Sequence, residues 1–195
     1  MKRVLLLVIW VFTTHIFGEE HSLAYKCNKE EDIDACRRVL GSYISALEIE
    51  LDWFTKEDLK LKKEPIITNL ADKVYIFYGE LCPPKKKEDM ILCIRALQSL
   101  YGAGRFVFDP AAIAIANLPM SGSVLKSACK NLLEGYFFIS RAYIYSPLCN
   151  GITEKHGKSI YKACSKIRDI REASKHLIEN NTKEIARCQK VLFNR

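Results

Sequence analysis

Cysteine is the residue whose number and spacing carry the most chemistry in this sequence. The chain has eight: Cys27, Cys36, Cys82, Cys93, Cys129, Cys149, Cys164 and Cys188. No two are separated by only two to four residues, the spacing typical of structural zinc sites. An even number of widely spaced cysteines in an exported chain instead predicts four disulfides. His21, His156 and His176 stand apart from one another, so we expect no metal ion and no other cofactor.

Helix geometry limits which cysteines can be joined. A disulfide needs Cα atoms closer than about 7 Å, and a helix rises about 1.5 Å per residue. Cys82 and Cys93 flank a proline-containing turn between two expected helices, so we predict that they pair across a helical hairpin. With a continuous helix that begins near Asn28, Cys27 and Cys36 lie too far apart to bond, so each is expected to reach another element. The remaining partners are not assigned.

The sequence lacks the short motifs of several extracellular enzyme classes. It has no H-E-x-x-H pair for a zinc hydrolase and no G-x-S-x-G nucleophile turn. Cysteines held in disulfides cannot serve as thiolate nucleophiles. The 23 acidic residues leave a carboxylate pair for glycoside cleavage as an open alternative. We expect a protein that is not an enzyme, and we assign no catalytic residue.

The amino terminus predicts export. Lys2 and Arg3 precede an unbroken apolar run from Val4 to Phe12, and Gly18 follows a few residues later. Charge, apolar run and small residue in this order are typical of a signal peptide, and the run is too short to span a membrane, which needs about 20 residues. We expect residues 1–18 to be a cleaved signal peptide.

The rest of the chain, residues 19–195, has the length and composition of one globular domain. It contains no later run apolar enough for a second membrane segment, so we expect a secreted, extracellular product without a transmembrane anchor. Asn180 begins an Asn-Asn-Thr sequon, which predicts N-linked glycosylation in the same pathway.

Apolar residues recur at helical spacing along most of this domain. The Asp109-Pro110 pair is typical of a helix start, so we expect one helix to end at Gly102 or Gly104 and another to begin at Asp109. The fold class predicted is an all-α, disulfide-stabilised bundle of about five to seven helices. The expected helices cover, approximately, residues 28–54, 67–81, 90–102, 109–118, 123–145, 154–179 and 181–192.

An apolar stretch in the middle of the chain could wall a cavity. Helices lined with aromatic and aliphatic residues suit small hydrophobic ligands, which tyrosine hydroxyls can orient. The alternative is that these side chains simply form a core. The candidate cavity residues are Phe106, Phe108, Ile113, Ile115, Tyr136, Phe137 and Tyr143.

Basic residues concentrate in the last third of the chain. Residues 121–195 carry 14 basic and 6 acidic groups. Lys155, Lys158, Lys162 and Lys166 repeat at helical spacing and predict a basic stripe, either for an acidic partner or merely for solubility. A nucleic acid is not expected outside the cell. The candidates are an anionic glycan, a membrane or an acidic protein patch.

These features favour a secreted, non-enzymatic binding or interaction protein that acts on an extracellular partner. The partner expected is a protein or a glycan. The alternative function is a carrier for a small hydrophobic ligand in the helix-walled cavity.

Overall fold

The computed structural model describes residues 22–52, 60–84, 86–117, 119 and 121–193. These residues form seven α-helices and two short 3-10 turns, with no strand among them, which confirms the predicted all-α class. The expected signal peptide lies outside the described residues. The helices are one over residues 22–30, α2 (Ile33–Asp52), α3 (Lys60–Leu81), α4 (Lys87–Asn117), α5 (Gly122–Tyr145), α6 (Lys158–Asn180) and α7 (Thr182–Phe193).

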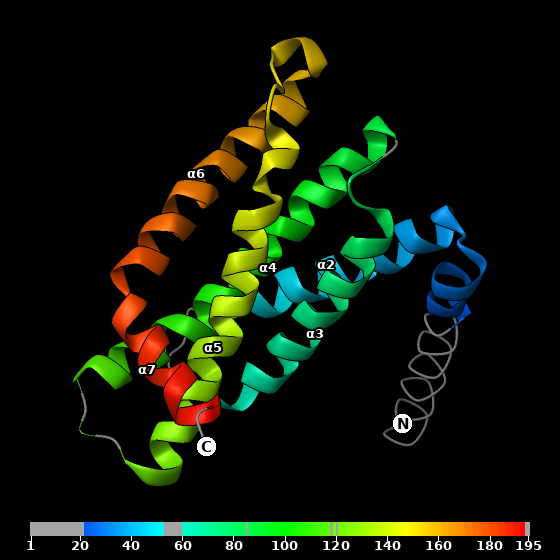
Figure 1. Cartoon of the computed structure of the whole chain (residues 1–195). Helices are drawn as coiled ribbons and strands as arrows, with labels where there is room; N and C mark the ends of the chain where they lie inside the picture. The colour runs from blue at the N-terminus through cyan, green and yellow to red at the C-terminus, as the bar shows by residue number, and fades with distance from the viewer. Residues whose placement is uncertain (1–21, 53–59, 85, 118, 120, 194–195) are drawn as a thin grey trace, which may run out of the picture.

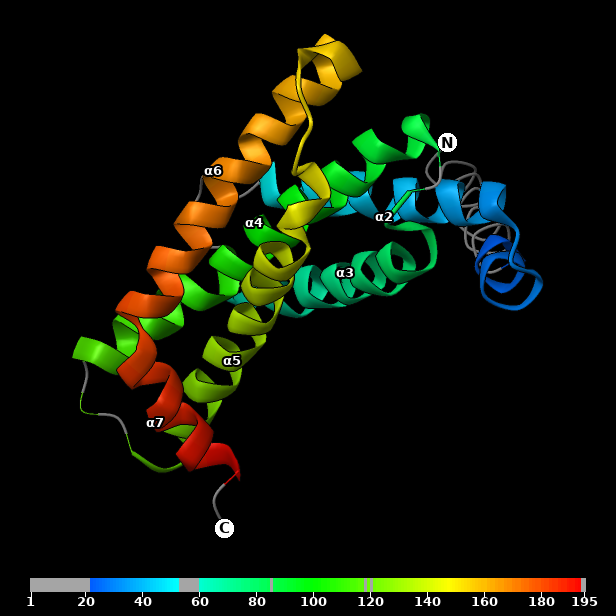
Figure 2. The same cartoon turned by 45° about the horizontal axis from the view of Figure 1, so that its top comes forward.

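Helix α4 is the centre of the bundle. It packs against α2 and α3 on one side and against α5, α6 and α7 on the other, an arrangement that both views show (Figures 1 and 2). Its amino-terminal half belongs to a core cluster shared with α2 and α3. Its carboxy-terminal half belongs to a second cluster shared with α5 and α7. The 31 residues of α4 therefore connect two cores.

The predicted boundary at Asp109-Pro110 is wrong, because α4 continues through both residues. Asp109 does not cap a helix; its carboxylate accepts from Arg105 Nε one turn earlier, at 2.6 and 2.9 Å. Pro110 is exposed, so the missing backbone hydrogen bond falls on the solvent side of the helix. Burial of the residues around it keeps the helix intact: Val107, Phe108, Ala111 and Ala112.

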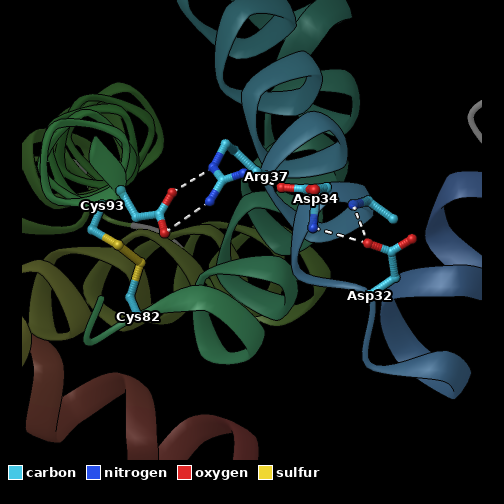
Figure 3. Close-up of polar contacts among 7 residues, drawn as sticks. Asp32, Asp34, Arg37, Cys82 and Cys93 are labelled. Carbon is cyan, nitrogen blue, oxygen red and sulfur yellow. Dashed lines mark hydrogen bonds and ion pairs between the residues drawn. A yellow bond between two sulfur atoms is a disulfide. The ribbon is translucent and has the colours of Figure 1, made fainter. Parts of the chain in front are cut away.

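All eight cysteines are paired, and Cys82 is bonded to Cys93 as the hairpin geometry suggests (Figure 3). Cys149 is bonded to Cys164, between the turn after α5 and the start of α6. Cys129 on α5 is bonded to Cys188 on α7, which closes the longest loop, of 59 residues.

The fourth disulfide corrects the prediction that Cys27 and Cys36 bond elsewhere. They are bonded to each other, with Cα atoms 4.7 Å apart. The chain does not form one helix here: Glu31 has a positive φ of 53°, which reverses its direction. Asp32 then caps α2, its Oδ1 accepting from the backbone N–H of Asp34 at 2.9 Å (Figure 3). Two helices that meet at a turn bring the two sulfurs together.

Two further properties concern the described part of the chain as a whole. None of its helices combines the length and the apolar character needed to cross a membrane. Within the same residues, no three His, Cys, Asp or Glu side chains gather closely enough to hold a metal ion.

Candidate functional site

The predicted cavity between α4 and α5 is occupied by the helices themselves. A Cβ atom placed on Gly135 would lie 2.6 Å from the backbone nitrogen of Phe108, and one on Gly104 would lie 2.7 Å from Ile139 Cγ1. The two glycines let the backbones approach directly, as small residues do at close helix crossings. Phe108 and Ile115 are buried in the second core cluster. Two of the predicted cavity residues therefore pack in a solid core.

The other predicted cavity residues are dispersed. Tyr136 packs at the edge of the second core cluster, and Ile113 is 64% exposed. Phe137 meets Tyr75 of α3 edge-on, with ring centroids 5.2 Å apart. Phe106 lines an open hollow on the surface of α4 and α5, and Tyr143 lies beneath the guanidinium of an arginine on α6. The structure does not bring the seven residues together around one space.

Three carboxylates on α3 and α5 interact electrostatically: Glu64, Asp72 and Glu134. Burial raises the pKa of Glu134, and the charge of Asp72 raises it further, while Lys130 lowers it. Burial is also the main cause of the raised pKa of Glu64, with the charge of Glu134 adding to it. The same cause raises the pKa of Asp72. The arrangement places like charges in partly dehydrated positions, which costs stability at neutral pH.

The lysines of the predicted basic stripe are exposed, but the helix expected from residue 154 begins at Lys158, so only three of the four lie on it. Lys158, Lys162 and Lys166 lie on α6, and Lys155 lies on the 3-10 turn η4 (Glu154–His156) just before it. All four side chains are exposed, and α6 lies at one edge of the molecule in both views (Figures 1 and 2). We call these four lysines the basic face. The opposite side of α6 is buried through Ile160, Cys164, Ile167 and Ser174.

The cations of α6 divide into two groups by their contacts. Arg168 lies over the ring of Tyr161 and Arg171 over the ring of Tyr143, at 5.6 and 5.8 Å from the centroids. These arginines are thus partly engaged within the protein. By contrast, none of the basic-face lysines forms an ion pair with the rest of the described chain. Their ammonium groups remain available to a partner.

The structure adds residues to this surface that the sequence did not indicate. A hollow of about 400 Å³ lies at the start of α6, and its lining includes Lys86, Lys155 and His156. Lys86 comes from the turn between α3 and α4, nearly 70 positions earlier in the chain. The three apolar residues Met90, Ile152 and Ile160 also line it. A lysine from a distant turn therefore joins Lys155, because α4 packs against α6.

Asn180 is exposed at the last position of α6. Thr182, the third residue of its sequon, donates from Oγ1 to the carbonyl oxygen of Glu179 at 2.8 Å. Fourteen residues separate Asn180 from Lys166, which corresponds to about 21 Å along a helix. A glycan on Asn180 would consequently begin well away from the basic face.

The chain matches no protein-family model, no curated protein and no solved structure.

Proposed function

We propose that the mature chain is a secreted interaction protein, and that its basic face binds an anionic extracellular partner, a sulfated polysaccharide. The observation that carries this proposal is the row of exposed lysines that lack ion pairs within the described residues. Export is supported by the amino-terminal signal pattern and by the four disulfides, which persist in oxidising compartments. Binding without catalysis remains part of the proposal.

The spacing of the lysines suits a linear polyanion. Lys158, Lys162 and Lys166 follow one another at intervals of four residues, about 6 Å along the helix axis. They therefore present charges in a row about 12 Å long, and Lys155 lies on the separate 3-10 turn η4 just before α6. A polymer with regularly spaced sulfates can pair with several of these amines at once, whereas a single small anion would engage one or two.

The disulfides keep this row rigid. Cys164 lies between Lys162 and Lys166 in the sequence, faces the interior and is bonded to Cys149. The bond fixes the first turns of α6 against the 3-10 turn η3 (Ser146–Cys149), and Lys155 lies in the loop that this bond closes. Because the backbone is already ordered, binding should cost mainly the side-chain entropy of the lysines.

Heparin binding tests the proposal. The double variant Lys158→Glu, Lys162→Glu should raise the Kd for heparin about tenfold or more at physiological salt. The affinity of the unaltered protein for heparin should fall as salt rises. The matched control is Lys126→Glu with Lys183→Glu, which makes the same change of charge on α5 and α7.

Two results would contradict the proposal. If the control pair weakens heparin binding as much as the basic-face pair, net charge and not a defined face is responsible. If the unaltered protein does not bind heparin or another sulfated polysaccharide at physiological salt, the proposed partner class is wrong. Turnover of an extracellular substrate by the purified protein would overturn the interpretation as a binding protein.

A further inference from the structure

A large groove lies on the side of the molecule away from α6. Its volume is about 730 Å³, and its walls come from the helix over residues 22–30, from α2 and from α3. This volume falls within the range of about 300–1,000 Å³ seen for small-molecule sites. The helix over residues 22–30, drawn in blue, lies at the edge opposite α6 (Figure 1). The groove is therefore separate from the basic face.

The floor of the groove is aromatic and aliphatic. Tyr43 of α2 and Phe77 of α3 stack with ring centroids 5.6 Å apart and 18° between their planes. Ala46 and Leu70 continue the apolar surface on the same two helices. At the lip, Ile76 is 48% exposed. Covering such exposed apolar area with a hydrocarbon is energetically favourable.

The groove also carries polar groups on two separate walls. Asn28 and Lys29 come from the helix over residues 22–30, and Asn69 and Lys73 come from α3. Both lysines are exposed. Asp72, the neighbour of Lys73 on α3, does not line the groove, although the charge of Lys73 lowers its pKa. The charged side chains that line this apolar space are therefore cationic.

One disulfide places the outer wall of the groove. Cys27 is almost fully buried, with 1% of its surface exposed, and its bond to Cys36 joins the helix over residues 22–30 to the first turns of α2. Asn28 and Lys29 follow Cys27 directly in the chain. A covalent bond consequently anchors the wall that carries these two residues.

We propose that this groove binds a free long-chain fatty acid. The acyl chain would cover the floor formed by Tyr43, Phe77 and Leu70, and the carboxylate would pair with Lys29 and Lys73 at the rim. A negative head group complements the two cations, and a hydrocarbon chain suits the apolar floor. The site does not depend on the function proposed for α6, and it lies elsewhere than the cavity predicted from the sequence.

Displacement of a fluorescent anthroyloxy-stearate from the delipidated protein tests this site. Oleate should displace the probe at least about tenfold more effectively than oleylamine, which has the same chain with a positive head. Lys29→Glu with Lys73→Glu should remove or reverse this preference. The control pair, Lys126→Glu with Lys183→Glu, should preserve it.

A second variant tests the floor. Ala46→Trp places an indole in the groove and should reduce probe binding about tenfold or more, whereas Ala173→Trp, at an exposed position on α6, should have no effect. Circular dichroism and the melting temperature establish that each variant is folded. Failure of the unaltered protein to bind the probe, retention of binding in folded Ala46→Trp, or equal displacement by oleate and oleylamine would overturn the proposal. Heparin binding should remain unchanged in Ala46→Trp.

Discussion

Arg37 on α2 and Asp89 on α4 form a two-pronged ion pair, in which Arg37 Nε donates to Oδ1 at 2.6 Å and Nη2 to Oδ2 at 3.2 Å (Figure 3). Only 2% of the Asp89 side chain is exposed. A second pair joins the same two helices with the arginine on α4 and the acid on α2: Arg95 with Glu48. Both of its side chains are more than a third exposed. The two pairs offer a direct comparison of a buried and an open ion pair.

Replacing Arg37 should cost much more stability than replacing Arg95. Arg37→Met leaves a buried carboxylate without its cation, which should lower the free energy of unfolding by about 3 kcal/mol. Arg95→Met removes an open, solvated pair and should cost less than about 1 kcal/mol. Urea denaturation at neutral pH measures both. Equal losses would mean that burial of Asp89 does not determine the strength of the contact.

Replacing two helical glycines by alanine should have opposite effects on stability, because only one of them lies at the crossing of α4 and α5. Gly135→Ala would place a Cβ atom 2.6 Å from Phe108 N and 2.7 Å from Gly104 O. Because backbone atoms cannot move aside alone, we expect a loss of about 2–3 kcal/mol. Gly79→Ala, inside α3 with nothing within 4 Å, should instead stabilise the protein by up to about 1 kcal/mol. Thermal unfolding of both variants distinguishes this account from one in which the α4–α5 interface is loosely packed.

Removing disulfides should have effects that follow the size of the loop each one closes. The Cys129–Cys188 bond closes 59 residues and Cys149–Cys164 closes 15. In the chain-entropy model, their loss costs about 4 and about 3 kcal/mol. We expect the Cys129→Ala, Cys188→Ala variant to melt below the Cys149→Ala, Cys164→Ala variant. Hydrogen exchange should also show loss of protection first in α7, since that bond joins α7 to α5. The reverse order of melting would contradict the prediction.

The carboxylates between α3 and α5 predict a pH-dependent effect at Glu134. Its pKa in the folded protein lies above the ordinary value of 4.5, mainly because of burial. A carboxyl with a raised folded pKa favours folding when protonated, and that contribution is lost as pH rises through the folded pKa. At pH 7 the ionised group therefore destabilises the fold.

Glu134→Gln should accordingly be more stable than the unaltered protein at pH 7. This advantage should disappear as pH falls below about 4.5, because the carboxyl is then neutral in both states. The free energy of unfolding, measured across this pH range, tests the sign of this stability change. The control is Glu172→Gln, on the exposed side of α6. A stabilisation that is independent of pH would point to packing and not to charge.

Much of the fold follows from local patterns in the sequence. Helical periodicity predicted α5 and α6 to within a few residues, because apolar residues recur at helical spacing in each. Pro147 follows closely after α5, and α6 ends at Asn180. The Cys82–Cys93 bond follows from a hairpin whose turn contains two prolines. These features depend on neighbouring residues, which the sequence states directly.

Other features depend on contacts between distant segments. Asp109-Pro110 has the chemistry of a helix start, but burial of the surrounding side chains keeps α4 continuous. Gly104 resembles a helix terminator, whereas the structure uses it where α4 approaches α5. The predicted cavity failed to appear as one space for the same reason: periodicity indicates that a face is buried, not whether a helix or a ligand covers it.

The candidate site was predicted only in part. The four lysines of the basic face were identified because their spacing matches a helix. Lys86 was not, since it reaches the hollow beside Lys155 through the packing of α4 against α6. The groove near Lys29 and Lys73 was also missed, because its outer wall depends on the turn at Glu31 and on the Cys27–Cys36 bond.

The most direct test of the central claim, a helical scaffold held by four disulfides outside the cell, is peptide mapping of the unreduced product. The full chain would be expressed in cells with a secretory pathway and digested without reduction for mass spectrometry. We predict protein in the medium that begins near Glu19 and yields four linked pairs: Cys27–Cys36, Cys82–Cys93, Cys129–Cys188 and Cys149–Cys164. A product that stays in the cytosol with alkylatable thiols, or that has other linkages, would contradict the account.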